Sequence, residues 1–516
     1  MPSIGIDFGT TNSLMVAYDK KKNEFLYFKY DNNKPVPTSS TVWFHDNHII
    51  VGKEARDNIL KYNETEGHYF EKSIKLKLGK EYSSEIFGVN YSASDIASFI
   101  LAALKKGATD ILENYISNVD INNAVMTVPI NFSGKARKDL REAANKSGIE
   151  VSTFIHEPFA AIIGYYFTKD KNNSFSDIVR EIQLLEKKYV LVFDWGGGTL
   201  DITIVMIDNG KMLEVGTAEL TGKAGDCFDE EIALWAWFKF IDKIGNKYTP
   251  EYLENIRIKK WNRLMAIAEK CKIELSSESE TMFLLENVIP NEDEEIYEVL
   301  TRSEFGKLIE RYIELSCNKI DEALKISGLA TNNIFKVLMV GGTSNIPSIQ
   351  DKLREKFGHR VEFLKNADLA IAQGAAVISE MGWIPFLAKD ILIELSDGSF
   401  YKLFENGLPL VKGEIPKISE TFTCVDQRNK FAKLIICDGY NQENDSTLGI
   451  INVPILSCNR FGDDIDVNAS IDNNIILHIK SNSKMINDLN SNISKQKSLE
   501  VHKLCFGLEC KGGEYD

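Results

Sequence analysis

The sequence lacks several features that mark well-known classes of protein. Its 516 residues contain no apolar run of about 18 residues, so we expect no transmembrane helix. The N-terminus MPSIGIDFGTTNS has no basic segment followed by an apolar one, which argues against a secretory signal. Basic residues number 60 against 75 acidic ones, and this charge balance disfavours nucleic acid and anionic membranes as partners. We therefore expect a cytoplasmic protein.

Cysteine is also scarce. The chain has eight cysteines and no C-x-x-C pair, which is typical of a cytosolic protein whose thiols stay reduced. In HKLCFGLEC, His502, Cys505 and Cys510 could bind a metal, but we favour a plain terminal strand for this stretch.

Two kinds of pattern divide the chain. Up to about Met381, β-rich hairpins alternate with helical spacing, which predicts an α/β region. From about Lys389, short runs of alternating apolar and polar residues lie between Gly, Asn and Asp turns and predict a small β domain. Between the two regions, DILIEL fits either a short apolar linker or an edge strand.

Glycine turns carry the strongest chemical signal. The same pattern occurs twice, in SIGIDFGTTNSLMVAYD and in YVLVFDWGGGTLDITIV. In each, a strand is followed by an Asp, a Gly turn with hydroxyl residues and a second strand. A third glycine turn lies in KVLMVGGTSNIPSIQDKL. Such turns let backbone amides converge on an anion, so two of them could clamp a polyphosphate. The aspartates Asp7, Asp194 and Asp201 would repel phosphate unless Mg²⁺ intervened. No P-loop motif is present.

The three glycine turns and four further motifs resemble those of the seventy-kilodalton heat-shock (Hsp70) chaperones, which belong to the actin-like ATPase superfamily. They are KSIKLKLG, VPINFSGKARKDLREAANKSGIE, FIHEPFAAIIGYY and AEKCKIELSS. The resemblance implies an α/β fold of two lobes around a nucleotide cleft, followed by an all-β sandwich. The domains expected on this basis are residues 1–385 for nucleotide binding, 386–396 as interdomain linker, and 397–516 as a peptide-binding β-sandwich without a helical lid.

The resemblance also implies a binding site for ATP or ADP with Mg²⁺ and K⁺. Asp7, Asp194 and Asp201 would organise the metal ions. The residues expected to hold the nucleotide are Gly9, Thr10, Thr11, Asn12, Gly196, Gly197, Gly198, Thr199, Gly225, Glu269, Lys272, Ser276, Gly341, Gly342, Thr343, Asn345 and Asp368.

The catalytic residues implied by the resemblance are Lys75, Glu157, Asp194 and Thr199. Lys75 would neutralise charge at the γ-phosphate, and Glu157 would orient water and metal. Without the resemblance, Lys75 would be read as one surface charge among 60 basic residues.

Pro129 and Arg137 match the family's relay between nucleotide and peptide domains, although a strand terminator is the commoner role of such a proline. 

Several residues depart from the family pattern. Asn345 stands where the family has an arginine that stacks on adenine. Thr153 and Glu394 lie near positions that the family uses to contact J-domain partners. Thr153 replaces an arginine there, which puts the usual J-domain partner in doubt. Residues 167–188 are longer than the family loop and fit a solvated surface helix better than a partner-binding insert.

The function implied is an ATP-driven chaperone that binds unfolded or extended apolar polypeptides, with a J-domain co-chaperone and a nucleotide exchange factor as candidate partners. An alternative is a nucleotide-gated holdase or exchange-type co-chaperone with little hydrolysis. A small-molecule kinase is a third reading, but the linker and β domain would then be superfluous.

Overall fold

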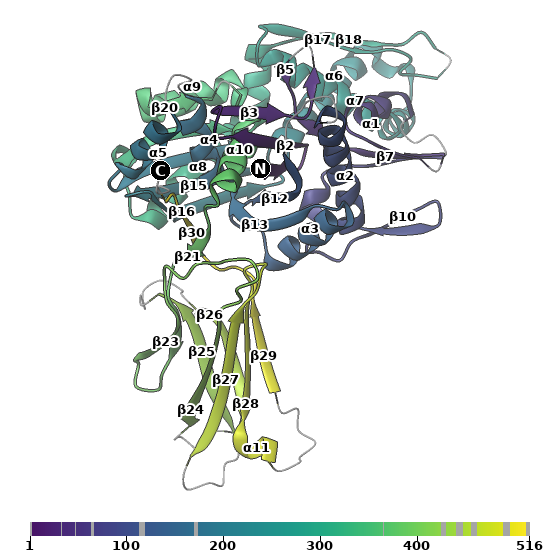
Figure 1. Cartoon of the computed structure of the whole chain (residues 1–516). Helices are drawn as coiled ribbons and strands as arrows, with labels where there is room; N and C mark the ends of the chain where they lie inside the picture. The colour runs from purple at the N-terminus through teal and green to yellow at the C-terminus, as the bar shows by residue number, and fades with distance from the viewer. Residues whose placement is uncertain are drawn as a thin grey trace.

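The protein has a large α/β body and an elongated β domain that extends from one side of it, as a computed structural model shows (Figure 1). The structure describes residues 3–31, 34–46, 48–62, 67–112, 119–169, 174–290, 292–364, 366–424, 430–439, 447–455, 462–488 and 496–511. Within these ranges, no helix is both long and apolar enough to cross a membrane.

The first lobe of the body is built on a mixed sheet. Its strands run in the order β13 (Glu150–His156), β12 (Asp120–Val128), β1 (Ser3–Phe8), β2 (Asn12–Asp19) and β3 (Glu24–Tyr27). Helices α2 (Ala93–Leu112) and α3 (Gly134–Lys146) pack on each other, and their apolar residues share a core with β1 and β12. A smaller sheet, with β7 (Val42–His45) between β8 (His48–Val51) and β9 (His68–Glu71), adjoins helix α1 (Lys53–Tyr62).

The second lobe has a seven-stranded sheet. Its order is β20 (Val361–Phe363), β19 (Ile334–Val340), β14 (Lys188–Trp195), β15 (Thr199–Asp208), β16 (Lys211–Thr221), β30 (Phe506–Glu509) and β21 (Pro385–Leu387). Its other elements include α6 (Gly225–Ile244), α7 (Pro250–Leu275), α8 (Arg302–Ser327), α9 (Pro347–Phe357) and the hairpin of β17 (Glu280–Leu285) and β18 (Ile296–Thr301). The β1–β2 and β14–β15 hairpins carry the two Asp-x-Gly turns, so each lobe supplies one turn.

Helices α4 (Glu157–Thr168) and α10 (Ala370–Met381) join the lobes, because one apolar core contains residues of both helices and of both sheets. Two glycines bring their backbones into contact. A Cβ on Gly164 would lie 2.0 Å from the Ala370 carbonyl oxygen, and one on Gly374 would lie 1.8 Å from that of Ala160. The lobes therefore share a tightly packed base beneath the cleft.

The β domain is a sandwich of two four-stranded sheets. One has the order β23 (Phe400–Phe404), β22 (Ile391–Glu394), β25 (Phe431–Asp438) and β26 (Thr447–Pro454). The other has the order β24 (Lys417–Cys424), β27 (Asp463–Ile471), β28 (Leu477–Ser483) and β29 (Gln496–Val501). Alternate residues of these strands are buried in one apolar core, as their spacing predicts. The expected fold class, a two-lobed α/β ATPase fold followed by a β-sandwich, is confirmed.

Residues 386–396, the expected linker, contain the end of one strand and the whole of another. The body strand β21 ends at Leu387, and DILIEL contains β22, which lies between β23 and β25 rather than at an edge. Ile391, Leu392 and Ile393 are buried, because they contribute to the sandwich. Neither a free linker nor an edge strand describes this stretch, and the domain limits 1–385 and 397–516 stay predictions.

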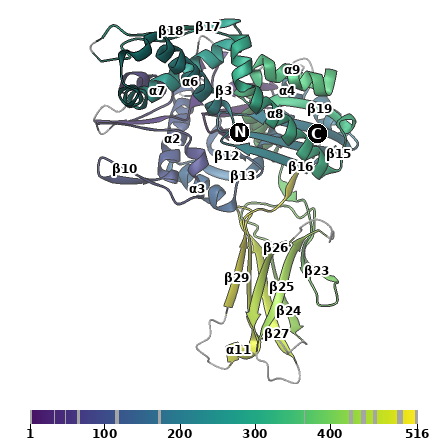
Figure 2. The same ribbon diagram turned by 180° about the vertical axis from the view of Figure 1, so that it is seen from behind.

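A second connection leads from the sandwich back to the body. After β29 the chain re-enters the second lobe as β30, which is hydrogen-bonded between β16 and β21 (Figures 1 and 2). HKLCFGLEC thus contains a strand, Phe506–Glu509, as favoured from its sequence, although the strand belongs to the body. Among the described residues, no group of three or more His, Cys, Asp or Glu side chains is arranged to hold a metal.

Two further predictions concern helices. Ile178 and Ile182, whose spacing predicts a helix within residues 167–188, are buried on α5 (Phe175–Gln183), which begins with a capping box at Ser174. The helix is amphipathic and packs on the shared core, while residues 170–173 lie outside the described ranges. Beyond β21, the one helix in the described residues is the short α11 (Lys484–Asp488), and the absence of a lid stays a prediction.

Candidate functional site

A large cleft between the lobes collects the residues that the glycine turns and the resemblance single out. With one exception, every residue expected to bind nucleotide, metal or γ-phosphate lines it. The exception is Gly225, which lies directly behind the wall: its N–H donates a 3.2 Å hydrogen bond to the Gly196 carbonyl. The roles of these residues stay predictions, but the structure brings together side chains from opposite ends of the chain.

The two glycine turns face each other across the cleft at close range. A Cβ on Gly197 would lie 2.1 Å from Oγ1 of Thr11, and one on Gly198 would lie 3.1 Å from Cγ2 of Thr10. The third turn touches the second, since a Cβ on Gly341 would lie 2.6 Å from a carboxylate oxygen of Asp194. Gly341 also has φ 79°, a conformation that favours glycine. Only residues without side chains allow the turns to approach this closely.

Lys75 and Glu157 form a buried ion pair at the base of the cleft. The ammonium of Lys75, on a short 3-10 helix (Ile74–Lys77), donates a 2.6 Å hydrogen bond to Oε1 of Glu157 at the start of α4. Each residue is only 7% exposed. Burial alone would lower the pKa of Lys75, but Glu157 and Asp7 raise it, so the lysine is held as a cation.

The three aspartates crowd around this pair. Burial, followed by the charge of Glu157, raises the pKa of Asp7 to about 6 and that of Asp201 to about 7. The same two causes raise the pKa of Asp194, which lies opposite Asp201 in the β14–β15 ladder. Four carboxylates thus share one ammonium, an arrangement that favours an additional cation.

These oxygen donors fit Mg²⁺ held largely through water. Mg²⁺ usually takes one or two carboxylates, keeps several waters and binds substrate phosphate. The hydroxyl oxygen Oγ1 of Thr11, which lines the cleft, is buried without a hydrogen-bond partner in the protein.

At the other end of the cleft, charged pairs hold the helices of the second lobe. Nζ of Lys272 on α7 donates hydrogen bonds to the Gly225 carbonyl at 2.9 Å and to Asp229 on α6 at 2.8 Å. Burial raises the pKa of Asp229 to about 7, although Lys272 opposes the shift. Glu269, also on α7, pairs with Arg56 of α1 at 3.0 Å, which bridges the two lobes above the cleft.

Sequence reasoning missed several of these residues. Arg56 and Asp229 carry no motif of their own, and only their partners are marked by the resemblance. A second bridge between the lobes was missed as well: the side-chain amide of Asn131 donates a 2.6 Å hydrogen bond to Glu219 on β16, and both residues line the cleft with Pro129.

Arg137, the predicted relay residue, lies at the junction with the β domain. Its guanidinium is buried and donates to three carbonyls of that domain, at 2.7 Å to Asn474, 3.3 Å to Ile475 and 3.1 Å to His502. Ile475 has φ 57°, which is rare for a β-branched residue. Such a conformation persists only where its surroundings hold it, and here Arg137 binds its carbonyl.

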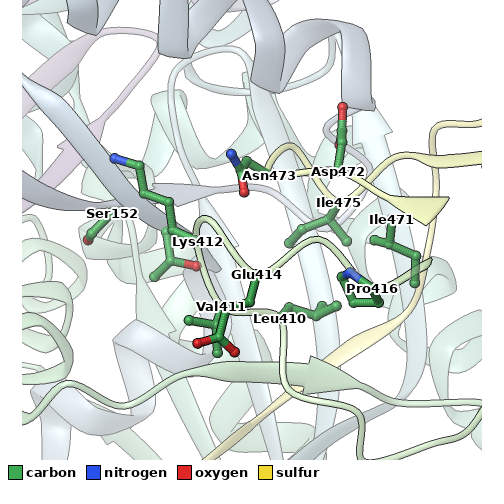
Figure 3. Close-up of a pocket in the computed structure, with 11 residues that line it drawn as sticks. Ser152, Leu410, Val411, Lys412, Glu414, Pro416, Ile471, Asp472, Asn473 and Ile475 are labelled. Atoms are coloured by element: carbon green, nitrogen blue, oxygen red, sulfur yellow. The ribbon is translucent and has the colours of Figure 1, made fainter.

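A small cavity marks the same junction (Figure 3). Ser152 and Thr153 of β13 form one wall, and the β domain supplies the segment around Lys412 and the turn at Asn473. Lys412 forms an ion pair with Glu150 of the body. Thr153 therefore faces the β domain, whereas Glu394 lies on β22 inside the sandwich sheet.

The chain matches one protein family and resembles a known chaperone in sequence. A family model described as "Hsp70 protein" matches residues 3–503. The chain is also 32% identical over 379 residues to the chaperone protein DnaK of Thermosipho melanesiensis, an alignment that covers 72% of this chain and 58% of that protein. The chain thus spans less than two thirds of the length of this curated relative.

Proposed function

Because the chain belongs to the Hsp70 family, we propose that it is an ATP-dependent chaperone that binds extended apolar polypeptide segments. The observation that carries this proposal is the meeting of two glycine turns beside the buried Lys75–Glu157 pair. Glycine adds no side chain of its own to these turns, so their backbone could approach the β- and γ-phosphates closely. A cleft of this construction suits hydrolysis of a nucleoside triphosphate.

The hydroxyl and charged side chains around the two turns each have a role in this proposal. The hydroxyls of Thr10, Thr11 and Thr199 donate to phosphate oxygens, and the ammonium of Lys75 stabilises charge that develops at the γ-phosphate. Mg²⁺, when bound beside Asp7, Asp194 and Asp201, would supply further charge neutralisation. Glu157 orients Lys75 and accepts a hydrogen bond from the attacking water.

The β domain is the proposed peptide-binding part. Its sandwich could take an extended segment by backbone hydrogen bonds and a side-chain pocket. Arg137 ties this domain to α3 of the body, so a change in the cleft can reach it through packed elements. A J-domain protein and a nucleotide exchange factor are proposed partners, although Thr153 already lines the junction with the β domain.

The decisive experiment is steady-state ATP hydrolysis with and without a panel of extended apolar peptides. Lys75→Ala is the inactive reference, and Lys77→Ala is its matched control, because Lys77 lies on the same short helix but pairs with Glu71 outside the cleft. We expect peptide-stimulated turnover in the wild type and in Lys77→Ala, and none in Lys75→Ala. ATP binding without turnover above the Lys75→Ala level would instead indicate the nucleotide-gated holdase.

A further inference from the structure

The strand β30 places one side chain against the catalytic region. Leu508 and Glu509 pair with Met212 and Lys211 of β16, while Phe506 pairs with Leu387 of β21. Gly507 leaves no room for a side chain, since a Cβ there would lie 2.7 Å from the Met212 carbonyl oxygen. The strand is therefore pressed closely into the edge of the second-lobe sheet.

Phe506 covers a buried pair of polar side chains that joins the two lobes. Its ring centroid lies 3.7 Å from that of His156, the last residue of β13 in the first lobe. Nδ1 of His156 pairs with Glu214, which belongs to β16 in the second lobe. All three side chains are largely withheld from solvent, so the contact between His156 and Glu214 depends on this packing for its low-dielectric surroundings.

His156 is also the residue that leads into the catalytic helix. It is the N-cap of α4, and its neighbour Glu157 begins that helix and receives the hydrogen bond of Lys75. The His156 side chain makes no capping hydrogen bond, so its position is set by Glu214 and Phe506 instead. A shift of the His156 backbone is transmitted directly to the Glu157 carboxylate.

Phe506 belongs at the same time to the apolar core of the β domain, together with Leu387 and Leu504. A single aromatic ring thus touches the sandwich core on one side and the histidine beside Glu157 on the other. The position of the Phe506 ring therefore depends on how β30 and the β domain pack against the body.

We propose that Phe506 is a positioning residue for ATP hydrolysis, which acts through His156 to hold Glu157 in place. The inference rests on the proposed function, because it concerns the same hydrolytic site. A change in how the β domain packs on the body would then move the Glu157 carboxylate, because strand β30 connects the two.

The test compares turnover and nucleotide affinity in full-length variants. Phe506→Ala is expected to lower kcat about tenfold, with the KM for ATP nearly unchanged, because a small displacement of a catalytic group costs rate before it costs binding. Phe506→Leu, which refills most of the space, should restore most of the rate. Leu504→Ala is the matched control, since it removes a buried side chain from the same core but keeps the Phe506 ring, and its kcat should stay within about twofold of the wild type.

A double-mutant cycle tests the route. If Phe506 acts through His156, adding Phe506→Ala to His156→Gln should lower kcat no further than His156→Gln alone. Multiplying effects of the two substitutions would overturn the proposed route.

Hydrogen–deuterium exchange of the peptide spanning residues 151–161, without nucleotide, gives a readout that does not depend on activity. Phe506→Ala should speed its exchange, whereas Leu504→Ala and Phe506→Leu should not. Faster exchange in a protein with no Lys75-dependent turnover would support the positioning contact and reject the proposed function. Unchanged exchange and unchanged kcat in Phe506→Ala would overturn the inference while leaving the proposed function standing.

Discussion

Lys75 and Glu157 come from separate parts of the first lobe, 82 residues apart, and form one buried pair with a 2.6 Å hydrogen bond. Neither side chain is satisfied without the other in an environment this poor in solvent. The pair therefore links the short 3-10 helix at the base of the cleft to the N-terminus of α4, and its disruption should have measurable consequences.

Glu157→Gln should abolish most hydrolysis while preserving ATP binding. The amide oxygen can still accept from Lys75, but a neutral group orients the attacking water poorly, so kcat should fall by about two orders of magnitude. Removal of the Glu157 charge should also lower the pKa of Asp7 and Asp201, for which that charge is the second cause of elevation. Single-turnover kinetics and carboxyl NMR titration measure the two effects, and an unchanged kcat would contradict the assigned role.

Metal-free protein should lose stability as the pH rises from about 4 to about 7. Asp7 and Asp201 have folded-state pKa values of about 6 and about 7, above the ordinary value of 3.8, so the folded state binds more protons in this window. Their contribution is complete below the ordinary pKa and is lost as the pH passes the folded-state values.

Thermal unfolding in EDTA, compared between the wild type and Asp201→Asn, checks this pH dependence. The variant should show a flatter decline of Tm across the window, because its side chain does not titrate. Mg²⁺ with ATP should raise Tm more at pH 7.5 than at pH 5.5, since metal binding requires ionised carboxylates. Equal slopes in the two proteins would argue against Asp201 as the source.

Gly197→Ala should weaken ATP binding by at least about tenfold. The new methyl group would lie 2.1 Å from Oγ1 of Thr11 and would force the two phosphate turns apart, an overpacking cost of about 1–3 kcal/mol. Gly306→Ala on α8 is the control, because its nearest neighbour would be at an ordinary 3.8 Å and alanine favours a helix. Fluorescent-nucleotide titration decides between them, and equal affinities would show that the turns tolerate separation.

Arg137→Ala should loosen the β domain from the body. It leaves the carbonyls of Asn474, Ile475 and His502 without their buried donor, at a cost of about 1–3 kcal/mol for each unsatisfied group. Arg137→Lys should not rescue the contact, because one ammonium cannot reproduce the planar fork.

Limited proteolysis and the radius of gyration in solution report the loosening. The neighbouring Lys138→Ala, whose side chain is exposed, serves as the control and should behave like the wild type. A compact, protease-resistant Arg137→Ala protein would show that the junction is held elsewhere, for example by Arg141 and its 2.8 Å hydrogen bond to the Asn473 carbonyl.

Local patterns predicted much of this molecule. The Asp-x-Gly turns predicted a place where backbone approaches a ligand, because glycine and flanking strands give a clear local pattern, and all three turns line one cleft. Alternation predicted a small β domain, since its strands bury one face, and the resemblance implied that it is a sandwich. The apolar spacing of Ile178 and Ile182 predicted α5 for the same reason.

Pairing between strands far apart in the sequence could not be predicted from local patterns. DILIEL reads as a linker or an edge because its apolar run is short, and only its neighbours β23 and β25 reveal an interior strand. Phe506 looks like an ordinary strand residue, since nothing local indicates that its partners are Leu387 and His156. Such contacts depend on the register of strands far apart in the chain, which residue spacing does not encode.

The return of β30 also orders events during synthesis. The strand that lies between β16 and β21 is synthesised after every strand of the sandwich, so the sheet edge of the second lobe stays open until then. Nascent chains stopped before residue 506 would carry the nucleotide turns but expose unpaired strand edges, which are sites for chaperone capture or aggregation. A protein proposed to protect other chains thus depends on its last described strand to complete its own α/β body.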